Sequence, residues 1–318
     1  MGVEERSAPA ASRGMPEGIP TLIVRPSDGH GRVGRELQEI VRYLRANDVE
    51  PTVVQAPRPG QGIRRARAAL SEGVRFLVSV GGDALAREVV AAVMEEGAGS
   101  TATLSVLGAG SGCDFVRTFG LPADAEAAAP RLLTGVPYLV DVVRVTCAAP
   151  RGGARVTYFA GLAEVGLGAA AVRRAARLPR WLGRGRYFGS FWLTMATFRV
   201  PQMRVSADGR EFRGRAHEVI VGNTQHAHGG IAMSPRSFPG DGVVDVLVMR
   251  GPRSDHYTLL PKMFWGEQLP NPGIVELRAR ERLEIDASRP VWVQADTEPL
   301  GTTPATFEVL PEVLRLKI

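Results

Sequence analysis

The first part of the chain alternates short apolar runs with longer segments in which apolar residues recur every three or four positions. The apolar runs predict buried strands, and the recurring spacing predicts amphipathic helices. The predicted strands cover residues 21–24, 51–54, 76–80 and 104–107. The predicted helices cover residues 34–46, 62–72 and 86–95. This alternation predicts a parallel sheet with right-handed crossovers, in which ligands bind at the carboxyl ends of the strands.

After about residue 138 the pattern changes, and strand-like runs follow one another with turn signals between them. The predicted strands here cover residues 138–145, 155–160, 203–207, 217–221, 243–249, 273–278, 282–286, 291–295 and 306–310. One helical region, residues 169–198, interrupts them. Closely spaced strands with turn residues between them are typical of an antiparallel sandwich-like domain.

Two predicted strands of the first part run directly into glycine-rich turns that are followed by a carboxylate. The first turn reads Gly81-Gly82-Asp83, and the second contains Gly110, Ser111, Gly112, Cys113 and Asp114. Glycine lets backbone N–H groups approach phosphate oxygens closely because no Cβ intervenes. A following carboxylate suits a site that holds a nucleotide and Mg²⁺. The alternative is a tight strand-to-helix turn in which Asp83 or Asp114 only caps the helix.

These segments resemble the G-G-D-G and G-T-G-N-D-F-A-R motifs of the diacylglycerol kinase catalytic-domain family. That family includes bacterial lipid kinases and sphingosine kinases, and it is related to the phosphofructokinases and NAD kinases. Residues 110–118 follow the second motif and continue into Phe119-Gly120-Leu121-Pro122. Residues 223–246 resemble the family's N…GG…P…DGxLDV block, and residues 296–299 resemble its D-G-E-P. The matches keep the family's order from residue 21 to residue 318.

The resemblance implies an α/β fold with an N-terminal Rossmann-like parallel sheet domain of the phosphofructokinase and NAD kinase type. It is followed by a C-terminal antiparallel β-sandwich domain. We expect a disordered tail at residues 1–19, a nucleotide-binding domain at 20–138 and a β-rich substrate domain at 139–310. The resemblance also implies that the end of the chain, residues 311–318, returns to the first domain.

The resemblance further implies that ATP and Mg²⁺ are bound. It assigns the nucleotide to residues of the two glycine turns, namely Gly81, Gly82, Asp83, Gly110, Ser111, Gly112, Cys113 and Asp114. Asp83 would help to organise Mg²⁺. Asp296 would be the general base and Glu298 its partner or a metal ligand. Residues i and i+2 of an extended strand point to one face, which would place both carboxylates together. The alternative for this pair is an ordinary surface turn.

A structural Mg²⁺ site is also carried over from bacterial members of the family. It would use the Asp241 carboxylate and the backbone carbonyls of Phe238 and Val243. An Asp-Gly turn in a β-rich domain needs no metal, so a plain turn stays open. His226 and His228 form an H-x-H pattern nearby, for which a loop role is favoured over metal binding because no third ligand is in view.

Three residues depart from the family motifs: Ala84 and Thr297 replace glycines, and Cys113 replaces an asparagine. The leading hypothesis is an ATP-dependent kinase that phosphorylates a hydroxyl of a diacylglycerol-like lipid. The departures keep open a degenerate kinase that binds nucleotide or lipid as a regulator. A kinase of a soluble small alcohol is the third hypothesis, because no single residue specifies a lipid.

Composition limits the partners. The 318-residue chain is 44% hydrophobic and carries a net charge of +6, mostly from arginine. Basic residues are interleaved with aromatic ones in residues 173–199, which suits an anionic membrane surface. A core-packing helix with a solvated basic face stays open as the alternative. No nucleic-acid-binding motif is present, and a homodimer stays open. Two cysteines make no disulfide framework. No segment is apolar enough to span a bilayer and no signal-peptide core precedes residue 20, so we expect a cytoplasmic protein with at most peripheral membrane contact.

Overall fold

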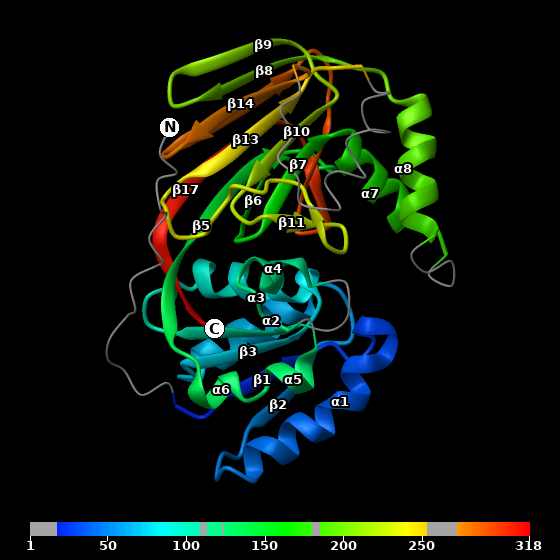
Figure 1. Ribbon diagram of the computed structural model, residues 1–318. Coiled ribbons are helices and arrows are strands. Elements are labelled where there is room, and N and C mark those ends of the chain that lie inside the picture. The colour runs from blue at the N-terminus through cyan, green and yellow to red at the C-terminus, as the bar shows by residue number, and fades with distance from the viewer. Residues whose placement is uncertain (1–17, 109–112, 123, 180–184, 253–271) are drawn as a thin grey trace. The chain divides into compact units, whose positions relative to one another are not determined.

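The computed structural model describes residues 18–108, 113–122, 124–179, 185–252 and 272–318. The chain divides into two compact units. The N-terminal unit comprises Met1–Val142, Phe238–Gly242 and Leu310–Ile318, and the C-terminal unit comprises Val143–Ser237 and Val243–Val309. Most of the tail expected at residues 1–19 lies outside the described residues. Figure 1 shows the elements of both units.

The N-terminal unit is built on a parallel sheet with the strand order β17-β4-β3-β1-β2. Its strands are β1 (Thr21–Val24), β2 (Thr52–Gln55), β3 (Phe76–Gly81), β4 (Thr103–Gly108) and the end of β17 (Glu298–Lys317). The last strand joins the sheet through Arg315, which pairs with Thr103 of β4. The residues of the chain's end therefore complete a sheet whose other strands lie more than 200 positions earlier.

Helices cover both faces of this parallel sheet. They are α1 (Asp28–Arg45), α2 (Gln61–Ser71), α3 (Asp83–Glu95), α4 (Asp114–Thr118), α5 (Ala125–Ala128) and α6 (Arg131–Thr134). One face packs against α1, α5 and α6, as the buried residues Leu22, Val78, Ile40 and Ala128 show. The other face is covered by α2 and α3, where α3 carries buried apolar residues along almost its whole length. Figure 1 shows these layers.

The C-terminal unit is almost entirely antiparallel. Its strands are β5 (Pro137–Ala148, which starts in the N-terminal unit), β6 (Ala154–Phe159), β7 (Leu162–Gly166), β8 (Gln202–Ala207), β9 (Arg210–Arg215), β10 (Glu218–Gly222), β11 (His226–Ala227), β12 (Ile231–Ala232), β13 (Val244–Met249), β14 (Ile274–Ala279), β15 (Arg282–Ala287), β16 (Trp292–Ala295) and the first part of β17. Two helices, α7 (Leu167–Ala176) and α8 (Gly185–Thr197), pack against each other.

Two antiparallel strand sets of this unit are joined by β17. The strand pairs with β16 near its start and with β15 further along. One set runs β14-β13-β10-β7-β16, and the other contains β15, β8 and β9. Inward-pointing residues such as Val165, Val219, Leu283 and Phe307 form one apolar core. This is the α/β fold class with an antiparallel second half that the sequence predicts.

Several elements escaped the sequence pattern for identifiable reasons. β9 is mostly charged and exposed, and β7 follows β6 after only a short break, so neither shows an apolar run with turn signals on both sides. α1 starts earlier than predicted, but Gly29, His30 and Gly31 have left-handed backbone and regular helix follows them. The predicted helical region at residues 169–198 is two helices, with residues 180–184 outside the described part of the chain.

Candidate functional site

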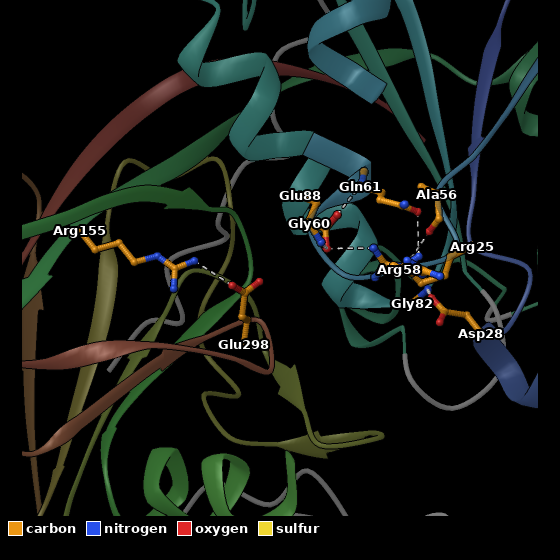
Figure 2. Close-up of polar contacts among 11 residues, drawn as sticks. Arg25, Asp28, Ala56, Arg58, Gly60, Gln61, Gly82, Glu88, Arg155 and Glu298 are labelled. Carbon is orange, nitrogen blue, oxygen red and sulfur yellow. Dashed lines mark hydrogen bonds and ion pairs between the residues drawn. The ribbon is translucent and has the colours of Figure 1, made fainter. Parts of the chain in front are cut away.

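The first glycine turn is a tightly packed junction between β3 and α3. Gly81 ends the strand, and Gly82 is the N-cap of the helix. The Gly82 N–H donates to Oδ2 of Asp28 over 2.9 Å, as Figure 2 shows. A Cβ added at Gly81 would lie 2.9 Å from that same oxygen and 2.9 Å from Leu85 Cδ2. A side chain at Gly81 would therefore require Asp28 or Leu85 to move, and Asp28 is a residue of this turn that the motif comparison did not assign.

Asp83 joins the two glycine segments. Its side chain is buried, and its carboxylate accepts the backbone N–H of Asp114 (2.9 Å) and of Phe115 (3.0 Å). These are the first two residues of α4, so Asp83 caps the helix that begins right after the second glycine segment. Ala84 is the second residue of α3 and has no left-handed backbone. The alanine at this family glycine position is thus accommodated without a different turn.

The second glycine segment is described only from Cys113 onward. Gly110, Ser111 and Gly112 lie outside the described residues, and their assignment to the nucleotide stays a prediction. Cys113 is fully buried, and a Cβ at Gly108 would lie 2.8 Å from the Cys113 Cβ. Burial raises the pKa of the Cys113 thiol well above its usual value, and the charge of Asp83 adds to this. Cys113 therefore stays a protonated packing residue at neutral pH.

A buried ion pair between Arg25 and Glu88 links the end of β1 to α3 and to the start of α2. Arg25 Nη2 lies 2.8 Å from Glu88 Oε1, and Arg25 Nε donates to the carbonyl oxygen of Ala56 over 3.2 Å. Glu88 also accepts the backbone N–H groups of Gly60 (2.9 Å) and Gly62 (2.7 Å) at the start of α2. Figure 2 shows this network. These contacts with Glu88 and Ala56 make Arg25 a structural residue of this site.

The Asp-Gly turn at residues 241–242 is anchored by Asp141. The buried Asp141 carboxylate accepts the N–H of Gly242 and the N–H of Glu312, each over 2.8 Å. Burial raises the pKa of Asp141, and these two backbone donors oppose the shift. Among the described residues, no group of three or more His, Cys, Asp or Glu side chains is placed to hold a metal ion. The predicted Mg²⁺ site has a single carboxylate, that of Asp241, and two backbone carbonyls, those of Phe238 and Val243. Such a site needs no cluster of side chains, and it stays a prediction.

Asp296 and Glu298 do not sit together on one extended strand, so the geometric premise for their pairing is wrong. Asp296 (φ 43°) and Thr297 (φ 67°) form the two-residue turn between β16 and β17. A turn with two positive φ values is the usual hairpin connection, and it reverses the chain direction between the two carboxylates. The alternation rule applies only to extended backbone, which is why it failed here.

Each of the two carboxylates has its own anchor. Asp296 Oδ1 accepts the Leu162 N–H over 2.8 Å, and a Cβ at Gly161 would come within 2.1 Å of the same oxygen. Glu298 Oε1 lies 2.8 Å from Arg155 Nη2 in a half-exposed ion pair, which Figure 2 shows. Asp296 is thus held against backbone at a strand end, whereas an arginine neutralises Glu298.

The basic and aromatic segment forms α7, α8 and the residues between them. α8 presents Phe188 (68% exposed) and Leu193 (55% exposed) to solvent, together with Tyr187. Arg173 stacks on the Trp292 ring, with its guanidinium carbon 3.8 Å from the ring centre. Arg180, Trp181 and Arg184 lie outside the described residues. No described helix is long and apolar enough to cross a membrane.

Comparisons with known proteins match both parts of the chain. The profile described as "Diacylglycerol kinase catalytic domain" matches residues 20–145. The profile described as "YegS C-terminal NAD kinase beta sandwich-like domain" matches residues 161–318. The resemblance that the motifs predicted is therefore confirmed: residues 20–145 match the diacylglycerol kinase catalytic domain, which supports a phosphotransferase.

Relatives match over most of the chain, and solved structures share its fold. A Citrobacter koseri protein named "Probable lipid kinase YegS-like" is 26% identical over 294 residues, which cover 92% of this chain and 94% of the relative. A Pseudomonas aeruginosa protein of the same name is 29% identical over 263 residues, covering 81% and 82%. A diacylglycerol kinase structure from Bacillus anthracis has a TM-score of 0.70 at 20% identity, covering 94% of this chain and 96% of that chain. The last similarity confirms the fold class.

Proposed function

We propose that the protein is an ATP-dependent lipid kinase that transfers the γ-phosphoryl group of ATP to a hydroxyl of a diacylglycerol-like lipid. The observation that carries this proposal is the Asp83 carboxylate, which joins the two glycine segments by capping α4. Such a link fixes two phosphate-binding segments relative to each other before any ligand arrives, and preorganisation of this kind is what phosphoryl transfer requires. The match to the diacylglycerol kinase catalytic domain and the names of the relatives support the lipid acceptor.

The residues fit a nucleotide at the start of α3. The helix has 13 residues, and its glycine N-cap places no side chain over the first turn. Backbone N–H groups at such a helix start favour phosphate oxygens, and the helix dipole adds to this. Mg²⁺, when bound, would neutralise phosphate charge, and the proposal assigns Asp83 and Asp114 to it. Asp241, with the carbonyls of Phe238 and Val243, is assigned to a separate structural Mg²⁺.

The proposal gives the acceptor proton to Asp296. Its carboxylate accepts the backbone N–H of Leu162. A carboxylate has about four lone-pair sites, so this bond does not by itself prevent it from accepting a hydroxyl hydrogen. The anchor keeps the side chain in one orientation, so little reorganisation accompanies proton transfer. Glu298 is held by Arg155 and would act on Asp296 or the acceptor only as a positioning group.

A transfer assay with radiolabelled ATP and Mg²⁺ tests the proposal. The acceptors are dioctanoylglycerol, sphingosine, phosphatidylglycerol and, as a soluble alcohol, glycerol. We expect transfer to dioctanoylglycerol. Transfer to glycerol alone would favour a kinase of soluble alcohols. Absence of transfer, together with absence of ATP binding by calorimetry, would refute the kinase.

Asp296→Asn provides a clean catalytic test, because asparagine suits the first position of this turn and keeps an oxygen for the Leu162 N–H. We expect turnover to fall at least about 100-fold, the lower range for a lost general base, while the melting temperature stays constant. Asp208→Asn is the matched control, since Asp208 also has left-handed backbone in a hairpin turn. The control should keep full turnover. Equal activities of both variants would remove Asp296 from the chemistry.

The proposal also includes an anionic membrane surface as the place where the lipid is bound. The outward residues Phe188 and Leu193 lie on α8, a helix whose only charged residue is Arg186, and Arg173 and Arg174 end the neighbouring α7. Apolar side chains beside arginines suit insertion at an anionic interface. We expect phosphatidylglycerol vesicles to sediment the protein and phosphatidylcholine vesicles to leave it in solution.

Replacing both outward residues with aspartate should abolish this sedimentation. Val156→Asp is the matched control, because Val156 is 51% exposed on β6, away from α8. If the control and the double variant lose vesicle binding equally, the face on α8 is not the contact surface.

A further inference from the structure

The peptide bond between Gly81 and Gly82 has more rotational freedom than one that joins two residues with side chains. A glycine on each side removes the Cβ clashes that normally limit the ψ angle before the peptide and the φ angle after it. Gly82 has ordinary extended backbone (φ −92°, ψ 179°) and is the N-cap of α3. Half a rotation of this planar unit would exchange the positions of its N–H and carbonyl groups while the strand and the helix stay in place. The turn therefore has two accessible orientations unless a partner selects one.

Asp28 is a partner that selects one of these orientations. Its Oδ2 atom accepts the Gly82 N–H over 2.9 Å, as Figure 2 shows, and lies 2.9 Å from the place that a Cβ of Gly81 would take. An ionised carboxylate accepts hydrogen bonds but has no hydrogen to donate to a carbonyl oxygen. The observed orientation is therefore stabilised by a charge-assisted hydrogen bond, whereas the reversed orientation would bring two acceptors together.

The position of Asp28 is fixed by the backbone of the loop after β1. The Asp28 N–H donates to the carbonyl oxygen of Arg25 over 3.0 Å, and the Gly31 N–H donates to that of Ser27 over 3.2 Å. Arg25 is itself held by the buried ion pair with Glu88 of α3. The carboxylate thus reaches the glycine turn from a loop that is tied to the same helix that the turn begins.

Asp28 and Asp83 act on different peptides of the candidate nucleotide site. Asp83 accepts the N–H groups of Asp114 and Phe115, which follow the second glycine segment. Asp28 accepts the N–H of Gly82, which belongs to the first glycine turn. Because the two carboxylates are bonded to separate donors, their contributions can be measured with separate variants.

A peptide that is only partly in the binding orientation weakens the affinity for its ligand in proportion. The apparent dissociation constant equals the intrinsic one divided by the fraction of molecules in the competent orientation. A hydrogen bond to a charged group keeps that fraction close to one. Without the bond, a fall of the fraction to about one tenth would weaken binding about tenfold.

We propose that Asp28 is a positioning residue for the phosphate donor: by fixing the peptide between Gly81 and Gly82, it keeps the start of α3 in the orientation that binds the phosphate groups. The inference rests on the nucleotide site proposed above. Asp28 acts through Gly82, and the proposal gives it no contact with the nucleotide. Loss of Asp28 therefore weakens binding of the phosphate donor and leaves binding of the lipid acceptor unaffected, whereas a general loss of stability would affect both.

Calorimetry with ATP and Mg²⁺ compares wild type with two variants of Asp28. Alanine removes the acceptor, so Asp28→Ala should weaken ATP binding at least about tenfold. Asparagine keeps the shape and one accepting oxygen, so the affinity of Asp28→Asn should stay within about threefold of wild type. In the transfer assay, Asp28→Ala should raise KM for ATP and change KM for dioctanoylglycerol less than about twofold.

Asp286→Ala is the matched control for the loss of an aspartate. Asp286 also accepts a backbone N–H, that of Ala287, but it lies on β15 in the C-terminal unit. This control should bind ATP like wild type.

Equal ATP affinities of Asp28→Ala and wild type would overturn the positioning role while leaving the kinase in place. Equal losses in Asp28→Asn and Asp28→Ala would also overturn it, because the charge and not the hydrogen bond would then decide the affinity. If Asp28→Ala fails to fold, Asp28→Ser, whose side chain is too short for this bond, replaces it.

If wild type does not bind ATP, the proposed function fails, and inorganic pyrophosphate takes the place of ATP in the same comparison. Pyrophosphate binding that Asp28→Ala weakens and Asp28→Asn retains would support the positioning role without a kinase. Absence of pyrophosphate binding, or equal binding by all variants, would refute the positioning role as well.

Discussion

Replacement of Asp83 by asparagine tests whether one carboxylate organises both glycine segments. Asp83 accepts the N–H of Asp114 with one oxygen (2.9 Å) and the N–H of Phe115 with the other (3.0 Å). Asparagine has the same shape but only one accepting oxygen, and its NH₂ group cannot accept a hydrogen bond. The variant therefore keeps one of the two bonds and leaves the other backbone N–H without its partner.

The size of the effect follows from the burial of this contact. A hydrogen bond to a charged group contributes about 1.5–3 kcal/mol, and a buried donor left unpaired costs about 1–3 kcal/mol. Both ranges include the loss of the same hydrogen bond, so they cannot simply be added. We expect Asp83→Asn to lower the free energy of unfolding by about 2–4 kcal/mol. For a chain of this size, about 2 °C corresponds to each kcal/mol, which gives a fall in melting temperature of about 4–8 °C.

Thermal melting and ATP calorimetry on the same variant complete the test. If capping of α4 by Asp83 positions the second glycine segment for ATP, ATP affinity should fall at least about tenfold alongside the melting temperature. Asp208→Asn is the control, since Asp208 also accepts backbone N–H groups, those of Arg280 and Arg282, but in exposed positions. It should lower the melting temperature much less. A change below about 1 °C for Asp83→Asn would refute the cap. Lost stability with unchanged ATP affinity would show that the cap does not shape the nucleotide site.

Three further predictions concern stability. Thr297→Gly should raise the free energy of unfolding by about 0.5–1 kcal/mol, since a β-branched residue at φ 67° is strained and glycine is not; a lower melting temperature would contradict this. The pKa of Glu218 is raised in the fold, so its stabilisation is present below pH 4.5 and is lost as the pH rises through the higher folded value. The melting temperature of Glu218→Gln should therefore equal that of wild type at pH 4 and exceed it by a growing margin as the pH rises towards 9. A difference in melting temperature that stays constant over that range would argue against the raised pKa of Glu218. Glu88→Gln should cost about 3–5 kcal/mol in urea unfolding because it leaves the buried Arg25 charge uncompensated, whereas the exposed Glu50→Gln should change nothing measurable.

The local pattern of the sequence determined the core elements and the family. A short apolar run that ends at glycines, such as residues 76–80, favours a buried strand, because burying apolar side chains is the main source of stability. Glycines at the ends of two such runs predict a close approach of phosphate, which stays a prediction. The structure adds that a Cβ at Gly81 or Gly108 would come within 3 Å of neighbouring side chains. Segment order along the chain then identified the family.

Contacts between distant segments were decided only by the tertiary structure. Asp83 is predicted as a possible ligand or cap, but nothing local shows that it meets α4, 31 positions away. Asp28 carried no prediction, and only the structure shows that it accepts the N–H of Gly82, 54 positions away. Asp296 was placed on an extended strand because alternation is the default, whereas the hairpin needs two left-handed residues there. Glu164 and Gln294 lie 130 positions apart and meet because β7 and β16 pair in one register. The sequence indicates which residues can be buried and where the chain can turn. Which carboxylate meets which hydrogen-bond donor depends on strand order and register, and these are set by the packing of the whole unit.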